Sequence, residues 1–328
     1  MEKRKLGQSN IEVSVVGVGC NNFGRRIHDV AVARAVVDRA IDLGITLFDT
    51  ADVYGDGTSE SFLGEAIGKR RAQVVIATKF GWGSPSGASR RTIARTVEAS
   101  LKRLRTDYID LYQVHYPDPN TPIEETLRAL DDLVRDGKVR AIGCSNFSGT
   151  QVSAALDTSA RTGTAAFVTC QDEYSLLVRK IERELAPLML KRGMTLLPYA
   201  PLAGGFLSGK YLRGKPLPKD ARLAYSSHHA TDVINERNWT MADRLRDFAA
   251  RTGHSMLDIA FGWLLARPVT ASVIAGAMTP EQVELNVRAG NVKLSTDDVA
   301  ELDRITKWAD PMTKPRAIII GGSVGGLF

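Results

Sequence analysis

The chain has 328 residues, of which 44% are hydrophobic and 24% charged, and this balance allows a large buried core and argues against a disordered protein. The net charge of +6 comes from lysines and arginines spread along the whole chain, which argues against nucleic acid as a partner. The 3 isolated cysteines, the short apolar runs and the lack of a signal-peptide pattern predict a cytoplasmic protein without disulfides, metal ligands or a membrane span. The sequence does not predict an oligomeric state.

From residue 13 onward, short apolar runs alternate with helical patterns. The runs cover residues 13–19, 45–50, 74–79, 108–115, 139–145, 167–173, 194–200 and 271–277, and the helical patterns cover residues 29–43, 90–104, 123–135, 148–161, 179–191 and 235–250. This alternation is typical of βαβ units, and nearly all-apolar strands are typical of a parallel sheet covered on both faces. Eight repeats predict an α/β fold, namely a (β/α)8 TIM barrel with an N-terminal β-hairpin, in residues 1–308.

Four reactive side chains lie where three successive predicted strands end. Asp49 and Tyr54 belong to "FDTADVYGDGTSE", Lys79 to "ATKFGWG" and His115 to "YQVHYPDP". In a TIM barrel, chemistry gathers at the carboxyl ends of the strands, so we expect the four groups to converge there.

These residue types suit the protonation of a carbonyl oxygen. An ammonium beside a phenol stabilises the phenolate, and a buried ammonium in turn needs a carboxylate partner. We therefore interpret Tyr54 as the proton donor, supported by Lys79 and Asp49, with His115 hydrogen-bonding the substrate oxygen. Taken singly, Asp49 could be a helix cap or turn residue, Tyr54 a half-buried packing residue and His115 a core histidine. Four such residues on one barrel rim nevertheless favour catalysis.

Six segments resemble the aldo-keto reductase family, in the family's order and across residues 3–306. They are "FDTADVYGDGTSESFLGEAI" (48–67), "ATKFG" (77–81), "DYIDLYQVHYPD" (107–118), "GKVRAIGCSNF" (137–147), "YAPLAGGFLSGKY" (199–211) and "GAMTPEQVELN" (276–286). The resemblance implies that Tyr54 is the general acid in reduction and the general base in oxidation, tuned by Lys79 and Asp49. It also implies that His115 orients the carbonyl.

The hydride must come from a cofactor, because no side chain supplies one and the barrel shows no flavin or metal motif. TIM barrels often bind phosphate with the loops after strands seven and eight and with a helix N-terminus. The first of these loops is "LAGGFLSGK" (202–210), which contains Lys210. In the second, "GAMTPEQ" (276–282), Thr279 is the predicted N-cap and Gln282 its partner in a capping box. Read alone, these strings are an ordinary turn and an ordinary helix start.

The resemblance also implies a nicotinamide site. Ser145, Asn146 and Gln171 would hydrogen-bond the amide and Tyr199 would stack on the ring, although Ser145 and Asn146 could instead cap the next helix and Tyr199 could be core. The full expected cofactor-binding set is Ser145, Asn146, Gln171, Tyr199, Leu202, Gly204, Lys210, Gly276, Thr279, Gln282 and Asn286.

One departure from the family concerns the choice of cofactor. Many members carry basic residues that grip the 2′-phosphate of NADPH where this chain has Gly276, Met278 and Gln282, and Leu285 replaces a common acidic adenine contact. We expect NADPH, because the family mostly uses it and Lys210 is available, with NADH as the alternative.

For the substrate, Phe23, Trp82 and Tyr116 are the expected lining residues, and the loop at 213–235 is expected to fold over the mouth. Aromatic walls favour moderately apolar aldehydes or ketones, although sugars also stack on them. The main hypothesis is therefore reduction of a small carbonyl compound. The alternatives are an NAD(P)-dependent dehydrogenase of a sugar or secondary alcohol and a non-catalytic nucleotide-sensing regulatory subunit.

The tail at residues 309–328 contains "IIIGGSVGGL", which resembles the start of a flavin-dependent monooxygenase. A dinucleotide-binding unit needs a whole helix and a second strand after its glycine-rich turn, and only two residues follow Gly326. We therefore expect this tail to be non-functional and loosely docked or disordered.

Overall fold

The computed structural model describes residues 1–82, 87–225 and 227–307. The expectations for the tail at 309–328 fall outside these residues and stay predictions.

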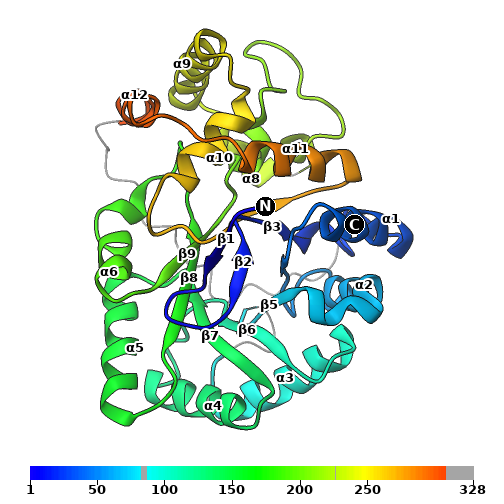
Figure 1. Ribbon diagram of the computed structural model, residues 1–328, viewed down its shortest axis with the longest axis vertical. Coiled ribbons are helices and arrows are strands. Elements are labelled where there is room, and N and C mark those ends of the chain that lie inside the picture. Colours follow the sequence, from blue (N-terminus) through cyan, green and yellow to red (C-terminus); the bar gives the residue numbers. More distant parts are fainter. Residues whose placement is uncertain (83–86, 226, 308–328) are drawn as a thin grey trace.

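The centre of the molecule is a closed parallel barrel (Figure 1). Its strands follow the order β10-β3-β4-β5-β6-β7-β8-β9. Two hydrogen bonds close the barrel by joining β9 to the segment just before β10: the Leu196 amide donates to the Val269 carbonyl at 2.7 Å and the Ala271 amide donates to the Leu196 carbonyl at 2.9 Å. The strands are β3 (Val16–Gly19), β4 (Leu47–Asp49), β5 (Val75–Phe80), β6 (Ile109–Val114), β7 (Val139–Ser145), β8 (Phe167–Glu173), β9 (Thr195–Tyr199) and β10 (Val273–Gly276). The predicted (β/α)8 barrel is confirmed.

An antiparallel hairpin of β1 (Lys3–Lys5) and β2 (Glu12–Ser14) lies across the amino end of the barrel (Figure 1). The Gly7 amide donates to the Thr195 hydroxyl and the Ser14 amide to the Thr46 hydroxyl, both at 2.9 Å. The predicted run at 13–19 is therefore two strands, the end of β2 and β3. Because the hairpin covers the amino end, the carboxyl end is the face left for ligands.

Helices form the outer ring of the barrel (Figure 1). They are α1 (Val30–Asp42), α2 (Thr58–Ile67), α3 (Arg90–Leu104), α4 (Ile123–Arg135), α5 (Gly149–Thr162), α6 (Leu185–Lys191), α10 (Met256–Leu265) and α11 (Pro280–Gly290). Two further helices, α9 (Glu236–Thr252) and α12 (Thr296–Thr306), pack against each other outside this ring. The predicted helix at 179–191 is wrong in its first half, which is the short 3₁₀ helix η3 (Lys180–Glu182) followed by α6. Pro187 lies in the first turn of α6 and would clash with the carbonyl of residue 183 in one continuous helix.

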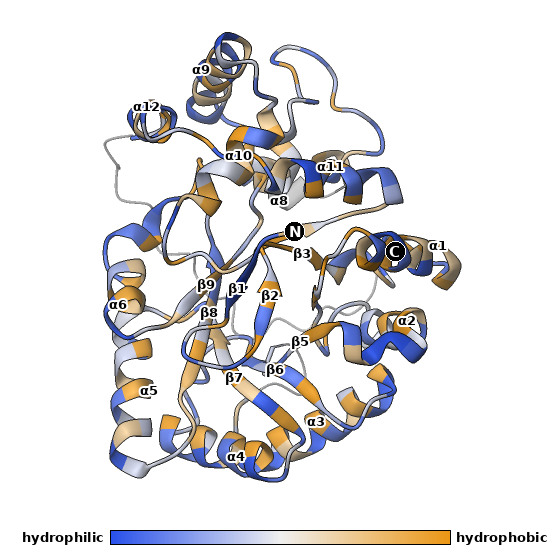
Figure 2. Cartoon of the chain, in the orientation of Figure 1, coloured by the Kyte–Doolittle hydropathy of each residue, from blue (hydrophilic) through white to orange (hydrophobic). Residues whose placement is uncertain are grey.

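Hydrophobic and hydrophilic residues alternate along each outer helix (Figure 2). In α3, Ile93, Val97, Leu101 and Leu104 recur at helical spacing and are buried. They belong to the main core between the helices and the strands, whereas a second, smaller core fills the barrel itself.

Period-two alternation along the strands places the reactive groups inside the barrel. Leu47 of β4 and Ala77 of β5 belong to the inner core, and Asp49 and Lys79 follow them by two residues. Parallel register pairs Asp49 with Ala77. The side chains of β4 and β5 that point into the barrel are thus apolar near the hairpin and polar at the carboxyl end, where the site lies.

Candidate active site

The deepest part of the site is an ion pair between Lys79 and Asp49. The Lys79 ammonium donates to Asp49 Oδ1 at 2.6 Å and to the Thr50 carbonyl at 2.8 Å. The Lys79 side chain is 0% exposed and that of Asp49 is 4% exposed. Because an isolated buried charge is very costly, each member of this pair requires the other.

Tyr54 lies next to the ammonium, with Lys79 Nζ 5.1 Å from the centre of the phenol ring. Burial acts to lower the pKa of Lys79, but the charges of Asp49 and Tyr54, and hydrogen bonds to both, raise it above its ordinary value. Lys79 therefore stays positively charged at neutral pH. The expected chain of Asp49, Lys79 and Tyr54 is present in the structure.

His115 lies on the other side of Tyr54, and the two ring centres are 5.7 Å apart in an edge-on arrangement. Burial, followed by the positive charge of Lys79, holds the pKa of His115 well below its usual value. The imidazole is therefore neutral at pH 7, with one N–H donor and one acceptor. Its Nδ1 has no hydrogen-bond partner among the described residues. Tyr54 and His115 thus provide two adjacent donors for one ligand oxygen.

The residues expected at the nicotinamide join this site through hydrogen bonds. The Gln171 amide nitrogen donates to Asp49 Oδ2 at 2.8 Å. The Tyr199 hydroxyl donates to Asn146 Oδ1 at 2.9 Å, and the Asn146 amide nitrogen donates to the His115 carbonyl at 3.0 Å. The structure thus brings these side chains to the edge of the catalytic group.

The alternative that Ser145 and Asn146 cap the next helix is wrong. Ser148 is the N-cap of α5 and forms a capping box with Gln151. Asn146 instead adopts a left-handed backbone, with φ of 62°. Such a conformation costs energy in a non-glycine residue and is concentrated at functional sites.

The loop after β9 turns sharply through the 3₁₀ segment η4 (Ala203–Ser208). Gly204 and Gly205 have φ of 68° and 90°, values that glycine adopts without strain. A Cβ on Gly204 would lie 2.8 Å from Leu223 Cδ2, so this loop packs directly on the segment that follows it. Lys210 ends the loop, and burial together with the charge of Arg26 lowers its pKa. A positively charged loop of this shape fits a phosphate group.

The loop after β10 leads into the N-terminus of α11. Thr279 is its N-cap and accepts from the Gln282 amide at 3.4 Å. The predicted reciprocal bond is wrong, because the Gln282 side chain accepts from the amide of Met278 at 2.9 Å and not from that of Thr279. The extended backbone of Thr279, with φ of −141° and ψ of 158°, places the Met278 amide over the first turn. The N-terminus of α11 keeps its favourable position for an anion.

The sequence profile of the Aldo/keto reductase family matches residues 15–307. The chain belongs to the aldo/keto reductase family. Accordingly, it is an NAD(P)H-dependent oxidoreductase, and members of its family act on small carbonyl compounds.

Individual relatives cover nearly the whole chain. The chain is 35% identical over 303 residues to a probable voltage-gated potassium channel subunit beta of Arabidopsis thaliana, covering 89% of this chain and 92% of the relative. It is 34% identical over 313 residues to a protein of the same description in Oryza sativa subsp. japonica, with 92% and 95% covered. It is 35% identical over 321 residues to the uncharacterized oxidoreductase YrpG of Bacillus subtilis (strain 168), with 93% and 96% covered.

Two of the residues expected to contact substrate, Trp82 and Tyr116, lie beside His115 at the rim of the candidate site. The Trp82 ring lies 5.0 Å from the His115 ring, and Tyr116 stacks on His115 at 5.5 Å. Trp82 is 45% exposed and therefore available to a ligand. Phe23 does not fit its expected role, because its side chain is 0% exposed and packs in the main core. Its buried side chain holds the loop after β3 against the core.

Sequence reasoning missed Asp52, which follows Asp49 in "DTAD". The Asp52 amide donates to the Lys79 carbonyl at 3.0 Å, which places this residue beside the catalytic pair. Burial, followed by the charge of Glu60, raises the pKa of Asp52 to about 7. The signal in the sequence was a second aspartate in the same loop, but its pKa depends on neighbours that only the fold brings together.

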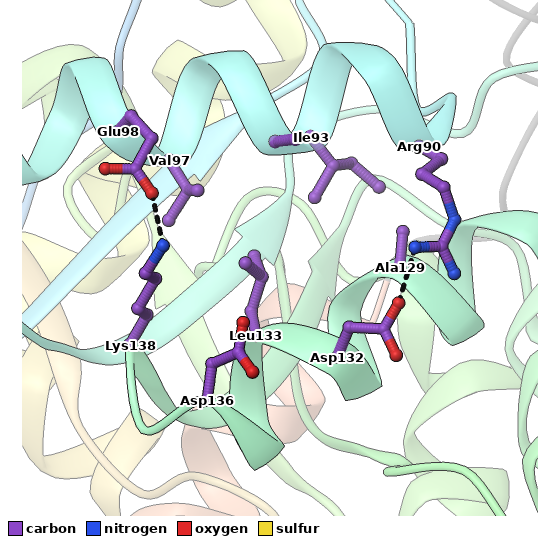
Figure 3. A pocket seen from close by; sticks show the side chains of 10 residues that line it. Arg90, Ile93, Val97, Glu98, Ala129, Asp132, Leu133, Asp136 and Lys138 are labelled. Carbon is purple, nitrogen blue, oxygen red and sulfur yellow. Dashed lines mark hydrogen bonds and ion pairs between the residues drawn. The ribbon is translucent and has the colours of Figure 1, made fainter.

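A separate hollow of about 190 Å³ lies between α3 and α4, on the outside of the barrel (Figure 3). Four of its five charged residues pair across the groove: Arg90 with Asp132 at 2.6 Å and Lys138 with Glu98 at 2.5 Å. Because these charges satisfy one another, we assign the groove to helix packing. No helix among the described residues is long and apolar enough to cross a membrane.

Proposed function

We propose that this protein uses NADPH to reduce an aldehyde or ketone to an alcohol. The observation that carries the proposal is the buried Asp49–Lys79 ion pair with Tyr54 directly beside it. This arrangement places a positive charge beside the phenol and a neutral His115 next to it, and therefore suits proton donation to a carbonyl oxygen.

A bound nicotinamide cofactor would supply the hydride, and with it the two electrons, that the carbonyl carbon gains in the proposed reaction. Tyr54 donates its hydroxyl proton to the carbonyl oxygen. The resulting phenolate is stabilised by Lys79 and regains a proton from water before the next turnover. His115 donates a hydrogen bond that holds the oxygen against Tyr54, and the same steps in reverse oxidise an alcohol.

Three groups of residues would hold the cofactor. The polar side chains of Ser145, Asn146 and Gln171 would bind the nicotinamide amide, and Tyr199 would face its ring. The phosphates would lie between the loop after β9, with Leu202, Gly204 and Lys210, and the start of α11. At the start of α11, the expected contacts to the cofactor are Gly276, Thr279, Gln282 and Asn286. The left-handed Gly204 and Gly205 and the N-terminus of α11 support the fit.

Steady-state kinetics with NADPH and NADH, in both directions, test this proposal. We expect higher kcat/KM with NADPH in the direction of carbonyl reduction. Higher kcat/KM with NADH, or activity only with a sugar or secondary alcohol, would support the dehydrogenase alternative, which the absence of basic side chains at Gly276, Met278 and Gln282 favours. No oxidation of either cofactor by any carbonyl compound would overturn the enzyme proposal.

A second candidate function is a nucleotide-sensing regulatory subunit. The observation that favours it is the similarity to two proteins described as probable voltage-gated potassium channel beta subunits. Binding and turnover distinguish the two functions: tight NADPH binding, measured by fluorescence, without carbonyl reduction would favour the regulatory subunit. The intact set of Asp49, Tyr54, Lys79 and His115 favours the enzyme.

A further inference from the structure

A cluster of positive side chains, which we call the basic rim, lies beside the proton donor. It consists of Arg25 and Arg26 in the loop after β3, Lys210 in the loop after β9, and Arg222 in α7 (Arg222–Tyr225). The Arg25 guanidinium lies 5.9 Å from the centre of the Tyr54 ring. Charges from three separate segments therefore meet at the carboxyl end of the barrel.

The basic rim is held together by contacts between its segments. The Arg26 guanidinium donates to the Asp220 carbonyl at 2.7 Å, which ties the loop after β3 to the chain before α7. Burial lowers the pKa of Arg222, and the charges of Arg26 and Arg25 lower it further. The rim residues are thus close enough to repel one another.

For three residues of the basic rim, no acidic side chain among the described residues balances this repulsion. In the described parts of the chain, Arg25, Lys210 and Arg222 form no ion pair, whereas Arg71 pairs with Asp110 at 2.7 Å. Positive charges that lie close together without carboxylate partners create a positive potential, which favours an anionic ligand. The basic rim therefore indicates an anionic ligand.

The anion could be a phosphate of the cofactor or an anionic group of the substrate, and the positions of Lys210 and Arg25 distinguish the two. Lys210 belongs to the loop expected to hold cofactor phosphate. Arg25 lies over the ring of Tyr54, is exposed, and belongs to the loop that borders the substrate side of the barrel mouth. A guanidinium binds a carboxylate or phosphate through two parallel hydrogen bonds.

We propose that Arg25 binds an anionic group of the substrate, so that the reductase prefers carbonyl compounds carrying a carboxylate or a phosphate. This inference rests on the proposed function, because it assumes that the carbonyl oxygen lies at Tyr54. Arg25 is then the residue that determines specificity, and the aromatic rim of Trp82 and Tyr116 contacts the rest of the substrate.

A pair of substrates that differ in one charge tests the inference. 4-Carboxybenzaldehyde and its neutral methyl ester, methyl 4-formylbenzoate, share the same aldehyde and ring. The variant is Arg25→Gln, and the matched control is Arg95→Gln, which removes the same charge from an exposed position on α3. Glyceraldehyde 3-phosphate against glyceraldehyde tests phosphate in the same way.

We expect the wild type to prefer the carboxylate or the phosphate over its neutral partner. Arg25→Gln should lower kcat/KM for the preferred anion by about tenfold or more, because a charge-assisted hydrogen bond is lost, and should change kcat/KM for the neutral partner by less than about threefold. Arg95→Gln should change neither. If kcat/KM falls for 4-carboxybenzaldehyde, Arg25 binds a carboxylate; if it falls for glyceraldehyde 3-phosphate, Arg25 binds a phosphate.

Binding gives a second readout that does not depend on turnover. Calorimetric titration of NADP⁺-saturated protein with 4-(hydroxymethyl)benzoate and, for phosphate, with glycerol 3-phosphate should show an anion affinity that falls in Arg25→Gln while NADP⁺ affinity is unchanged. Loss of NADP⁺ affinity, an equal loss for charged and neutral substrates, or no loss for either anion would overturn the inference. Failure of the wild type to reduce any aldehyde would count against the proposed function, and the titration would still decide the role of Arg25.

Discussion

Lys79 and Asp49 form an ion pair, 2.6 Å long, that the barrel closes off from solvent. Removing one partner leaves the other buried without compensation. We expect Asp49→Ala to lower the free energy of unfolding by about 3–5 kcal/mol, measured by urea denaturation. The double variant Asp49→Ala with Lys79→Met should recover part of this loss, because it removes the buried ammonium as well. An unchanged midpoint and slope in the single variant would contradict the pairing.

Tyr54→Phe keeps the ring beside Lys79 and His115 but removes the hydroxyl. We expect turnover of carbonyl compounds to fall by about 10²–10⁴-fold, the range typical of a lost general acid. The dissociation constant for NADPH, measured by fluorescence, should change little, because Tyr54 is not among the residues assigned to the cofactor. A Tyr54→Phe variant as active as the wild type would remove Tyr54 from its assigned role.

Asp52 gives the protein a pH dependence of stability. Its pKa is 3.8 as an ordinary aspartate and about 7 in the folded chain, so the folded state binds the proton more tightly. Ionisation of Asp52 therefore destabilises the folded state. This loss of stability is absent below pH 4, grows as pH rises from 4 to 7, and is complete above pH 7. We expect Asp52→Asn to be more stable than the wild type at pH 8 by roughly 2 kcal/mol, about half of what the pKa difference allows.

Thermal unfolding of both proteins at pH 5 and pH 8 checks this expectation. The gain in Tm for Asp52→Asn should be larger at pH 8 than at pH 5. A gain of equal size at both values would mean that the carboxylate charge is not its cause.

Gly204 requires both its backbone conformation and its lack of a side chain. Gly204→Ala would place a Cβ 2.8 Å from Leu223 Cδ2 at a φ of 68°, and should displace the loop after β9. We expect the dissociation constant for NADPH to rise by about fivefold or more, since the loop carries the groups assigned to phosphate.

Gly163→Ala is the matched control, because Gly163 has a φ of 67° and open space around it. This variant should lose about 1–2 kcal/mol of stability through backbone strain alone, and its NADPH affinity should stay that of the wild type. Similar NADPH affinities for the two variants would contradict the assignment of this loop.

Deletion of residues 309–328 should leave carbonyl reduction unchanged. The family match ends at residue 307, before this tail. Comparison of kcat and KM for the full and shortened chains checks this. A large loss of activity in the shortened chain would mean that the tail contributes to the substrate pocket.

Much of the barrel could be predicted, because strands buried on both faces carry a dense apolar pattern that needs no knowledge of their neighbours. The convergence of Asp49, Tyr54, Lys79 and His115 could also be predicted, since parallel strands in one barrel all end at the same rim. The predictions that were wrong concern segments whose structure depends on the elements packed against them. The run at 13–19 is apolar apart from Ser14, yet it divides between hairpin and barrel because the chain changes sheets after Ser14.

The sequence by itself determined which residue types are present and where each strand ends, and these two facts define the catalytic group and its family resemblance. Only the tertiary structure decided which side chains become charged neighbours. Phe23 and Arg25 are two residues apart, yet one is buried in the core and the other lies over Tyr54. Burial and electrostatic interaction depend on distances between distant segments, and those distances exist only once the barrel has closed.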